Sequence, residues 1–304
     1  CSSELKWASG TEQVNIGTFT HEFGHVIGLP DFYDTDGNTN GNGHTPGSWS
    51  VMAGGCYNND SRTPPLYGAI ERQQLGWCTI PKCPDGAITL NKIQNSSNTP
   101  GYKINTDTND EFYVLEYRER TGFDSSLPGS GMLIWHVDRS SNRYISFETG
   151  GTNYDSYFTG KILWDNWNSP NNKSGHPCYD LVECSNPHTN NGDTPLNESS
   201  MWPNGGRNSY QPYGWSGAAT SPLTNIVNHG TYATFNCNGG GGEETTCTKT
   251  DRAVVTFYKD INYGGDAVGL PEGSFTKSQM GAYCLEDNWV SSLKVLPGYK
   301  VTVY

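Results

Sequence analysis

THEFGHVIGLPDFYD, residues 20–34, is the stretch of sequence from which both fold and chemistry are predicted. His21 and His25 are one helical turn apart, so both imidazoles leave the same face of a helix and can bind one Zn²⁺. Glu22 lies beside the first ligand, where its carboxylate can take a proton from water at the metal. The apolar residues of this segment also recur at helical spacing, which predicts a second face packed on a core: Ile16, Phe19, Phe23, Val26 and Ile27.

The end of this predicted helix indicates a third ligand. Gly28 tolerates the left-handed conformation that ends a helix, and Pro30 prevents the helix from resuming. Asp31 can therefore turn back toward the metal, an arrangement that resembles the metzincin site with Asp in place of the third His. Asp34 is the alternative third ligand, since spacing does not exclude it. Solvated helix histidines are the plainer interpretation, but the glycine turn followed by an acidic residue favours zinc.

Composition limits the class of protein. A chain of 304 residues has room for one large domain or two ordinary ones. Hydrophobic residues make up 34%, aromatic residues 12%, and there are 37 glycines, which favours a loop-rich protein with much β-structure. The formal net charge of −12 argues against nucleic acid as a partner and suits Ca²⁺. No apolar run reaches the length of a membrane span, and no signal peptide precedes the helix, so we expect mature material.

Nine cysteines indicate an oxidising compartment and therefore a secreted protein. Local disulfides are plausible for Cys78–Cys83, Cys178–Cys184 and Cys237–Cys247, but sequence does not fix the pairing. The odd number leaves one thiol over. No cysteine pair has the two-residue spacing of a zinc knuckle, which argues against cysteines as zinc ligands.

Residues 1–80 are predicted to form the catalytic portion. Only about twenty residues precede the helix, enough for one strand near Glu12–Ile16, whereas a metzincin-type cleft needs an upper sheet before its helix. We therefore expect another chain or segment to complete this portion, or the chain to be a fragment. Within Trp49–Met52, Met52 is followed by small residues, which suits the methionine turn beneath a metzincin metal site.

The loop after the helix is a candidate calcium site. Asp34, Asp36 and Asn38 alternate with other residues and offer oxygen ligands. The alternative is an ordinary polar turn, because Asn, Asp and Gly are the commonest turn residues.

Residues 81–237 are predicted to be rich in β-structure. A short helix is expected over Pro64–Trp77, ending at Gly76. Residues 111–118 alternate in the manner of a half-buried strand, and residues 131–138 indicate a buried one. His136, inside that second run, is interpreted as a packed strand histidine and not as a ligand.

These segments together resemble the immune inhibitor A family of secreted zinc metallopeptidases. The resemblance rests on residues 21–34, Trp49–Met52, Leu75-Gly76-Trp77, and the runs at 127–138 and 175–183. It implies a zincin endopeptidase that is often calcium-stabilised and made as a zymogen. By this resemblance His21 and His25 bind zinc, Glu22 is the general base, and an acidic residue, Asp31, is the third ligand.

The C-terminal part is predicted to be a separate all-β motif. Residues 238–246 form a Gly-rich linker, and residues 254–258 are a strand. Residues 258–265 and 273–275 resemble a βγ-crystallin Greek key, and residues 287–292 resemble that family's calcium motif. Asp287, Asn288 and Ser291 are then the calcium ligands, with a metal-free turn as the alternative. Residues 300–304 resemble the first strand of a second Greek key, so the motif over 247–304 is expected to be incomplete.

The fold predicted from sequence is α+β: a zincin-type, metzincin-like lower subdomain with a β-rich part, followed by the βγ-crystallin-like motif. The predicted function is secreted zinc-dependent hydrolysis of proteins or peptides. The alternative is a catalytically inactive extracellular structural or adhesive protein that binds calcium on a protease-like fold. A weaker alternative takes the aromatic C-terminal half as a carbohydrate-binding surface.

Overall fold

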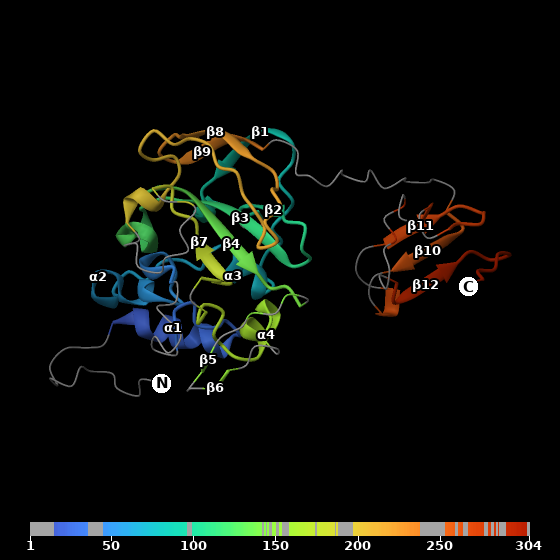
Figure 1. Ribbon diagram of the computed structural model, residues 1–304, viewed down its shortest axis with the longest axis horizontal. Coiled ribbons are helices and arrows are strands. Elements are labelled where there is room, and N and C mark those ends of the chain that lie inside the picture. The colour runs from blue at the N-terminus through green and yellow to red at the C-terminus, as the bar shows by residue number, and fades with distance from the viewer. Residues whose placement is uncertain are drawn as a thin grey trace. The chain divides into compact units, whose positions relative to one another are not determined.

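The computed structural model divides the chain into two compact units, Cys1–Gly240 and Gly241–Tyr304, which are described separately (Figure 1). It describes residues 15–35, 45–95, 99–141, 143, 145, 148–149, 152–153, 158–173, 175–185, 187, 197–237, 253–258, 261–263, 267–276, 279–280, 283, 285 and 290–302. The described elements are short helices and antiparallel sheets, so the fold class is α+β.

The first unit is built on a four-stranded antiparallel sheet in the order β2-β3-β4-β7. Its longest pair joins Glu111 to Asp138 at one end and Arg118 to Gly131 at the other. The strands are β2 (Tyr102–Asn105), β3 (Glu111–Arg118), β4 (Gly131–Asp138) and β7 (Tyr179–Leu181).

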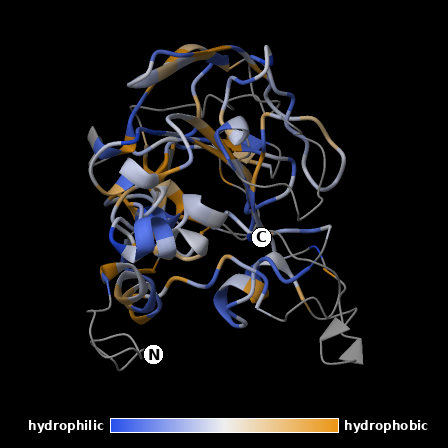
Figure 2. Ribbon diagram, turned by 90° about the vertical axis from the view of Figure 1, so that its left-hand side faces the viewer, coloured by the Kyte–Doolittle hydropathy of each residue, from blue (hydrophilic) through white to orange (hydrophobic). Residues whose placement is uncertain are grey.

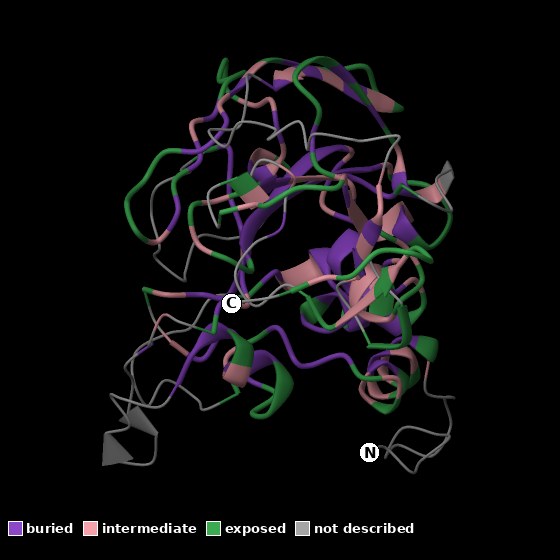
Figure 3. Ribbon diagram, turned by 90° about the vertical axis from the view of Figure 1, so that its right-hand side faces the viewer, coloured by how far each residue is buried: buried purple, intermediate pink, exposed green. Residues whose placement is uncertain are grey.

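Both faces of β3 and β4 are covered, and every residue of the two strands is buried (Figure 3). On β3, Phe112 and Val114 belong to one hydrophobic core, whereas Tyr113 and Leu115 belong to another. The alternation expected for residues 111–118 therefore does not separate a core face from a solvent face. It divides the side chains between two cores, because a second layer packs on each side of the sheet.

The layer on one side is a three-stranded antiparallel sheet in the order β1-β9-β8. Ile88, Leu90 and Phe235 of this sheet share a core with the side chains of β3. Its strands are β1 (Gly86–Asn91), β8 (Leu223–Asn228) and β9 (Tyr232–Cys237), and a separate short hairpin pairs β5 (Glu148–Thr149) with β6 (Thr152–Asn153).

The layer on the other side holds the helices and the segment after the first helix. Leu29, Phe32, Trp49 and Met52 pack in one core with β4. The helices are α1 (Ile16–Val26), α2 (Asn58–Ser61), α3 (Ala69–Gln74) and α4 (Gly160–Asp165). The helix expected over 64–77 is thus shorter, because it begins only after the Gly68 cap and ends before Gly76, whose φ is +72°.

Helix α1 does not pack through its apolar stripe, which corrects the sequence prediction. Phe23 and Val26 are 58% and 78% exposed, and Ile16 and Phe19 are exposed as well (Figures 2 and 3, helix nearest the N label). The buried residues are Gly17, His21 and Gly24.

Glycine explains why this face is the one that packs. A Cβ on Gly17 would lie 1.8 Å from the Cys56 carbonyl oxygen, and a Cβ on Gly24 would lie 2.3 Å from Met52 Sδ. Only a residue without a side chain allows the helix to approach that closely. The close approach places Met52 against Gly24, and His21 lies on the same buried face of the helix.

The second unit contains a three-stranded antiparallel sheet in the order β11-β10-β12. Val255, Phe257, Leu270 and Leu285 form its own small core. Its strands are β10 (Val255–Tyr258), β11 (Ala267–Leu270) and β12 (Ser292–Val295). The strand expected at 300–304 is not found over residues 300–302, and residues 303–304 lie outside the described part. Among the described residues, no helix is both long and apolar enough to span a bilayer.

Candidate metal centre

Helix α1 presents two imidazoles to one point. His21 and His25 are separated by one turn, and their Nε2 atoms lie 3.2 Å apart. His21 is 9% exposed, and the His25 ring lies at the margin of the site with its side chain 27% exposed.

The turn after the helix brings Asp31 to the same point. Gly28 has a φ of +106°, and Leu29 N–H donates to the Gly24 carbonyl at 3.0 Å, which reverses the chain. Asp31 Oδ1 then lies 3.2 Å from His21 Nε2 and 3.2 Å from His25 Nε2. Asp34, the alternative ligand, is half-buried and does not belong to this group of ligating atoms.

The outward hydrogen bonds of the histidines fix which nitrogen faces the centre. His21 Nδ1 lies 2.9 Å from the Val51 carbonyl oxygen, and His25 Nδ1 lies 2.8 Å from the Leu29 carbonyl oxygen. A carbonyl can only accept, so each Nδ1 must carry the proton that it donates. In the neutral rings both Nε2 atoms therefore carry a lone pair directed at the centre, as metal-binding imidazoles require.

The three inward atoms fit a cation. Asp31 Oδ1 is buried and has no hydrogen-bond partner among the described residues. Three lone-pair atoms at mutual distances of 3.2 Å repel one another unless a positive charge lies among them. Tetrahedral zinc with bonds of about 2.0 Å sets its ligand atoms roughly 3.3 Å apart. The donor set and its spacing therefore suit zinc.

Asp31 is held from the far side by Asn168, which the sequence analysis did not identify. Asp31 N–H donates to Asn168 Oδ1 at 2.8 Å, and Asn168 Nδ2 donates to Asp31 Oδ2 at 2.9 Å. Asn168 lies 137 positions along the chain, just beyond α4, and no spacing rule links it to the histidines.

Charge within the site favours the ionised carboxylate. Burial by itself would raise the pKa of Asp31, but the contact with His21, the imidazole charges and Asn168 outweigh it and lower that pKa. Burial would likewise lower the pKa of His21, but Asp31 and the Val51 carbonyl raise it. A lowered carboxylate pKa beside a raised imidazole pKa is expected when the two groups are in contact at a partly buried site.

Two further side chains border the site. Glu22 is half-buried and lies near enough for its charge to raise the pKa of His21. Tyr33 stacks on His21 with ring centroids 6.4 Å apart. Burial and the nearby Asp31 charge raise the pKa of Tyr33 to about 12, so its phenol keeps its proton at neutral pH.

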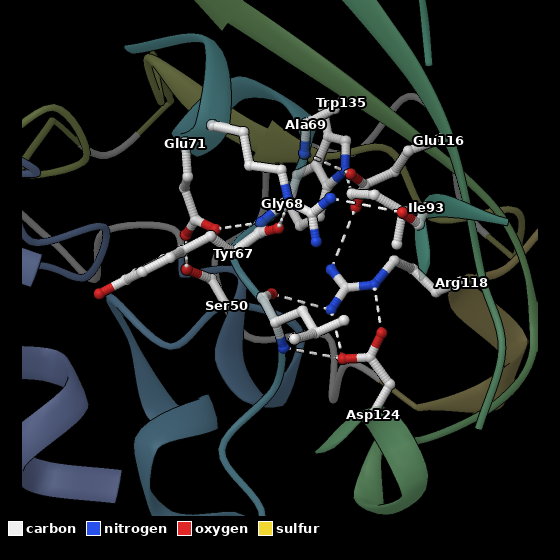
Figure 4. Close-up of polar contacts among 12 residues, drawn as sticks. Ser50, Tyr67, Gly68, Ala69, Glu71, Ile93, Glu116, Arg118, Asp124 and Trp135 are labelled. Carbon is white, nitrogen blue, oxygen red and sulfur yellow. Dashed lines mark hydrogen bonds and ion pairs between the residues drawn. The ribbon is translucent and has the colours of Figure 1, made fainter. Parts of the chain in front are cut away.

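Met52 packs against Gly24 of α1, in a turn that hydrogen bonds hold on both sides. Met52 is fully buried, its N–H donates to Ser50 Oγ at 3.1 Å, and its carbonyl accepts from Phe32 N–H at 2.9 Å. Ser50 Oγ in turn donates to Glu71, a buried residue of α3 (Figure 4). This arrangement connects the histidine helix, the turn and α3 through buried contacts.

The network continues to the central sheet. Arg118 on β3 contacts Asp124 Oδ1 at 2.6 Å and Glu116 Oε1 at 3.3 Å, and all three are buried (Figure 4). Glu116 also accepts from Ala69 N–H at 2.7 Å and from Trp135 Nε1 at 3.1 Å. Two acidic side chains around one buried guanidinium, with their oxygens hydrogen-bonded, connect the start of α3 to the sheet.

The candidate calcium residues lie mostly outside the described part of the chain. Asp36, Asn38, Asp287 and Asn288 are all outside it. Ser291 is described, and its N–H donates to the Tyr258 carbonyl at 2.9 Å. Calcium binding at either loop stays a prediction.

The described cysteines do not form the local disulfides Cys78–Cys83 and Cys178–Cys184, and Cys247 of the third suggested pair lies outside the described residues. All six carry free thiols: Cys56, Cys78, Cys83, Cys178, Cys184 and Cys237. The Cys83 thiol is hydrogen-bonded to Cys237, which follows from the pairing of β1 with β9. His136 lies on β4 as a packed histidine, 2.9 Å from Glu111 Oε1 and stacked on Tyr113.

Comparison with known proteins connects the first part of the chain to a peptidase family. A family model described as immune inhibitor A peptidase M6, catalytic domain, matches residues 6–73, which include α1, Asp31 and Met52. Immune inhibitor A of Bacillus thuringiensis subsp. alesti is 50% identical over 42 residues, covering 14% of this chain and 6% of that protein. The matched part therefore resembles a metallopeptidase.

A second relative is of another kind. Development-specific protein S of Myxococcus xanthus is 38% identical over 52 residues, covering 17% of this chain and 30% of that protein. The chain thus spans less than a third of the length of either curated relative. No solved structure gives a significant match.

Proposed function

We propose that this protein is a zinc-dependent endopeptidase that cleaves protein or peptide substrates. The observation that carries the proposal is the triangle of His21 Nε2, His25 Nε2 and Asp31 Oδ1, with all three edges 3.2 Å long. The other ring nitrogen of each histidine and the other oxygen of Asp31 are hydrogen-bonded, and the match to a peptidase catalytic domain covers the same residues.

The roles of the residues follow from their positions. Zinc bound by His21, His25 and Asp31 would supply a Lewis acid that activates water and polarises the scissile carbonyl. Glu22, next to the first ligand on α1, accepts the proton of the attacking water and passes it to the leaving amine. Tyr33, protonated at neutral pH, can donate a hydrogen bond beside His21.

The setting proposed for this activity is extracellular. Nine cysteines, the acidic charge and the resemblance to immune inhibitor A support a secreted enzyme made as a precursor and stabilised by calcium. The C-terminal unit is proposed to be a βγ-crystallin-like motif, on the strength of its sequence resemblance.

Glu22→Gln tests the catalytic assignment. The amide keeps the size of the side chain but cannot accept a proton, so we expect zinc content to be unchanged and casein cleavage to fall by at least 10²-fold. Glu198→Gln, at an exposed position away from α1, is the matched control and should cleave as the unaltered chain does.

The same experiment distinguishes the endopeptidase from the alternative function. Undiminished cleavage by Glu22→Gln would remove Glu22 from the mechanism. A zinc-loaded, folded chain that cleaves no casein before or after substitution would favour the inactive extracellular structural protein instead.

A further inference from the structure

A second group of ligating side chains lies in the first unit, away from α1. Asp138 is the last residue of β4, and His176 and Cys178 precede β7. One ligand atom from each lies within 4.8 Å of the others. The backbone already joins these segments, since Asp138 N–H donates to the Cys178 carbonyl at 2.9 Å.

The group is buried and partly fixed in position. Asp138 and Cys178 are fully buried, and the His176 side chain is 16% exposed. Asp138 Oδ2 lies 2.8 Å from His176 Nε2, and Asp138 Oδ1 accepts from Ser140 N–H at 2.9 Å. The hydrogen bond between Asp138 and His176 explains why these two polar side chains can be buried, but it does not involve Cys178.

One buried group beside that pair needs a further explanation. Among the described residues, the Cys178 thiol makes no hydrogen bond, although its sulfur lies within 4.8 Å of ligand atoms of both Asp138 and His176. Unpartnered polar atoms are uncommon in protein interiors, and an ion or water often accounts for them.

We propose that Asp138, His176 and Cys178 bind a second zinc ion, whose role is structural. Thiolate, imidazole and carboxylate are all zinc ligands, whereas a thiolate does not suit calcium or magnesium. In tetrahedral zinc the ligand atoms lie roughly 3.3–3.6 Å apart. On binding, the 2.8 Å contact between His176 Nε2 and Asp138 Oδ2 would lengthen, and the Cys178 sulfur, within 4.8 Å of the other two ligand atoms, would move inward.

The surroundings suit a structural ion rather than a second catalytic one. Trp215 stacks on His176 with ring centroids 4.1 Å apart, and it also stacks on His136 at 5.4 Å. The Trp215 indole therefore covers the imidazole, and two of the three ligands have no exposed surface. A substrate carbonyl cannot reach such a centre.

The position of the site connects it to the first one. Asn168, which is hydrogen-bonded to Asp31, lies ten residues before Cys178 of the second group. Between them, Asn171 Nδ2 donates to the Phe32 carbonyl at 2.9 Å. Cys178 N–H then donates to the Pro170 carbonyl at 3.0 Å. An ion at Cys178 would fasten the far end of the segment that positions Asp31.

Cobalt spectroscopy on the full chain tests this proposal. Thiolate ligation gives Co²⁺ a charge-transfer absorption in the near ultraviolet, and the first site offers only nitrogen and oxygen. We expect the Co²⁺-loaded chain to bind two ions and to show this absorption. Cys178→Ser should lose the absorption. Cys184→Ser, at a buried cysteine outside the group, should keep it.

The two sites can be told apart by removing each in turn. His25→Ala should lower the metal content by one ion and leave the absorption intact, whereas His176→Gln should lower the content by one and abolish the absorption. His176→Gln also serves if Cys178→Ser fails to fold, since Gln can still donate to Asp138. Thiolate absorption that survives in Cys178→Ser, or a single ion lost entirely in His25→Ala, would overturn the second site. Failure of His25→Ala to change the metal content would count against the proposed peptidase centre alone.

Discussion

Asn168 supports Asp31 through two hydrogen bonds, and a substitution there tests whether the carboxylate must be held. Asn168 has a φ of +51°, so Asn168→Gly removes the side chain without backbone strain. Residues that orient a metal ligand typically contribute 10–100-fold to metal affinity. We therefore expect the zinc dissociation constant, measured by competition with a chromogenic chelator, to rise by about that factor.

Asn59→Gly is the matched control for this experiment. Asn59 has the same φ of +51° and is exposed, so the substitution makes the same backbone change away from Asp31. Equal zinc affinity in Asn168→Gly and the unaltered chain would show that Asp31 does not depend on the amide.

At the scale of the residue, sequence spacing predicted only some of the residues that form the site. His21, Glu22 and His25 lie within one turn of α1, and Gly28 is the kind of residue that turns a chain back. The groups behind them are distant in sequence: Val51 O for His21 and Asn168 for Asp31. Their positions depend on how separate segments pack, which no short pattern specifies. Sequence spacing paired Cys178 with Cys184 and argued against cysteines as zinc ligands, because Asp138 of the second group lies far along the chain, at the end of β4.

At the scale of the element, α1 shows how an amphipathic pattern can mislead. The pattern predicted burial of Phe23 and Val26, yet the helix packs through Gly17, His21 and Gly24. The apolar pattern failed because the packed face depends on glycine, which allows a close approach of the backbone. Glycine has no side chain, so it does not contribute to a hydrophobic pattern.

Gly17→Ala and Gly24→Ala test this packing and should differ in cost. At Gly17 the new Cβ would lie 1.8 Å from a backbone oxygen of Cys56, which cannot move without the turn. At Gly24 it meets the flexible end of Met52. We expect Gly17→Ala to lower the free energy of unfolding by about 1–3 kcal/mol or more, and Gly24→Ala by less, measured by urea denaturation.

Thr18→Ala supplies the comparison on the same helix. It also introduces alanine, but at a half-buried position between the packed residues. Alanine favours helices intrinsically, so a gain in stability for Gly17→Ala similar to that of Thr18→Ala would contradict the close contact.

Helix α3 is joined to the methionine turn by Glu71, which predicts a pH dependence. Burial raises the pKa of Glu71 from 4.5 to about 7. The unfolded chain then loses this proton at lower pH than the folded one, so Glu71 lowers stability as pH rises from about 4.5 to about 7. The Gln side chain in Glu71→Gln can still accept a hydrogen bond from Gly68 N–H and donate one to Ser50 Oγ. Because Gln does not ionise, this substitution removes the loss of stability with rising pH.

Urea denaturation of both proteins across this pH range measures the effect. The free energy of unfolding of Glu71→Gln relative to the unaltered chain should increase with pH, by about 3 kcal/mol, and then level off. Asp31, whose pKa is lowered, acts in the opposite sense at lower pH, but it is common to both proteins. Parallel stability profiles would mean that Glu71 ionises in the folded state as readily as in the unfolded one.

For the whole molecule, each unit has its own core and its own predicted metal ligands. The two larger cores belong to the first unit, and the smaller core formed by Val255, Phe257, Leu270 and Leu285 belongs to the second. The zinc ligands lie in the first unit, and the predicted calcium residues near 287–291 lie in the second. We therefore expect two thermal transitions with separate responses to chelators.

Calorimetry with two selective chelators tests this division. A ligand present at a thousand times its dissociation constant stabilises the folded state by about 4 kcal/mol. At roughly 2–4 °C per kcal/mol for a unit of this size, removing zinc with 1,10-phenanthroline should lower the larger transition by about 10 °C. EGTA, which prefers calcium, should lower the smaller transition if residues 287–291 bind that ion. A phenanthroline response confined to the smaller transition would contradict zinc binding by α1, because every proposed zinc ligand belongs to the unit that melts in the larger one.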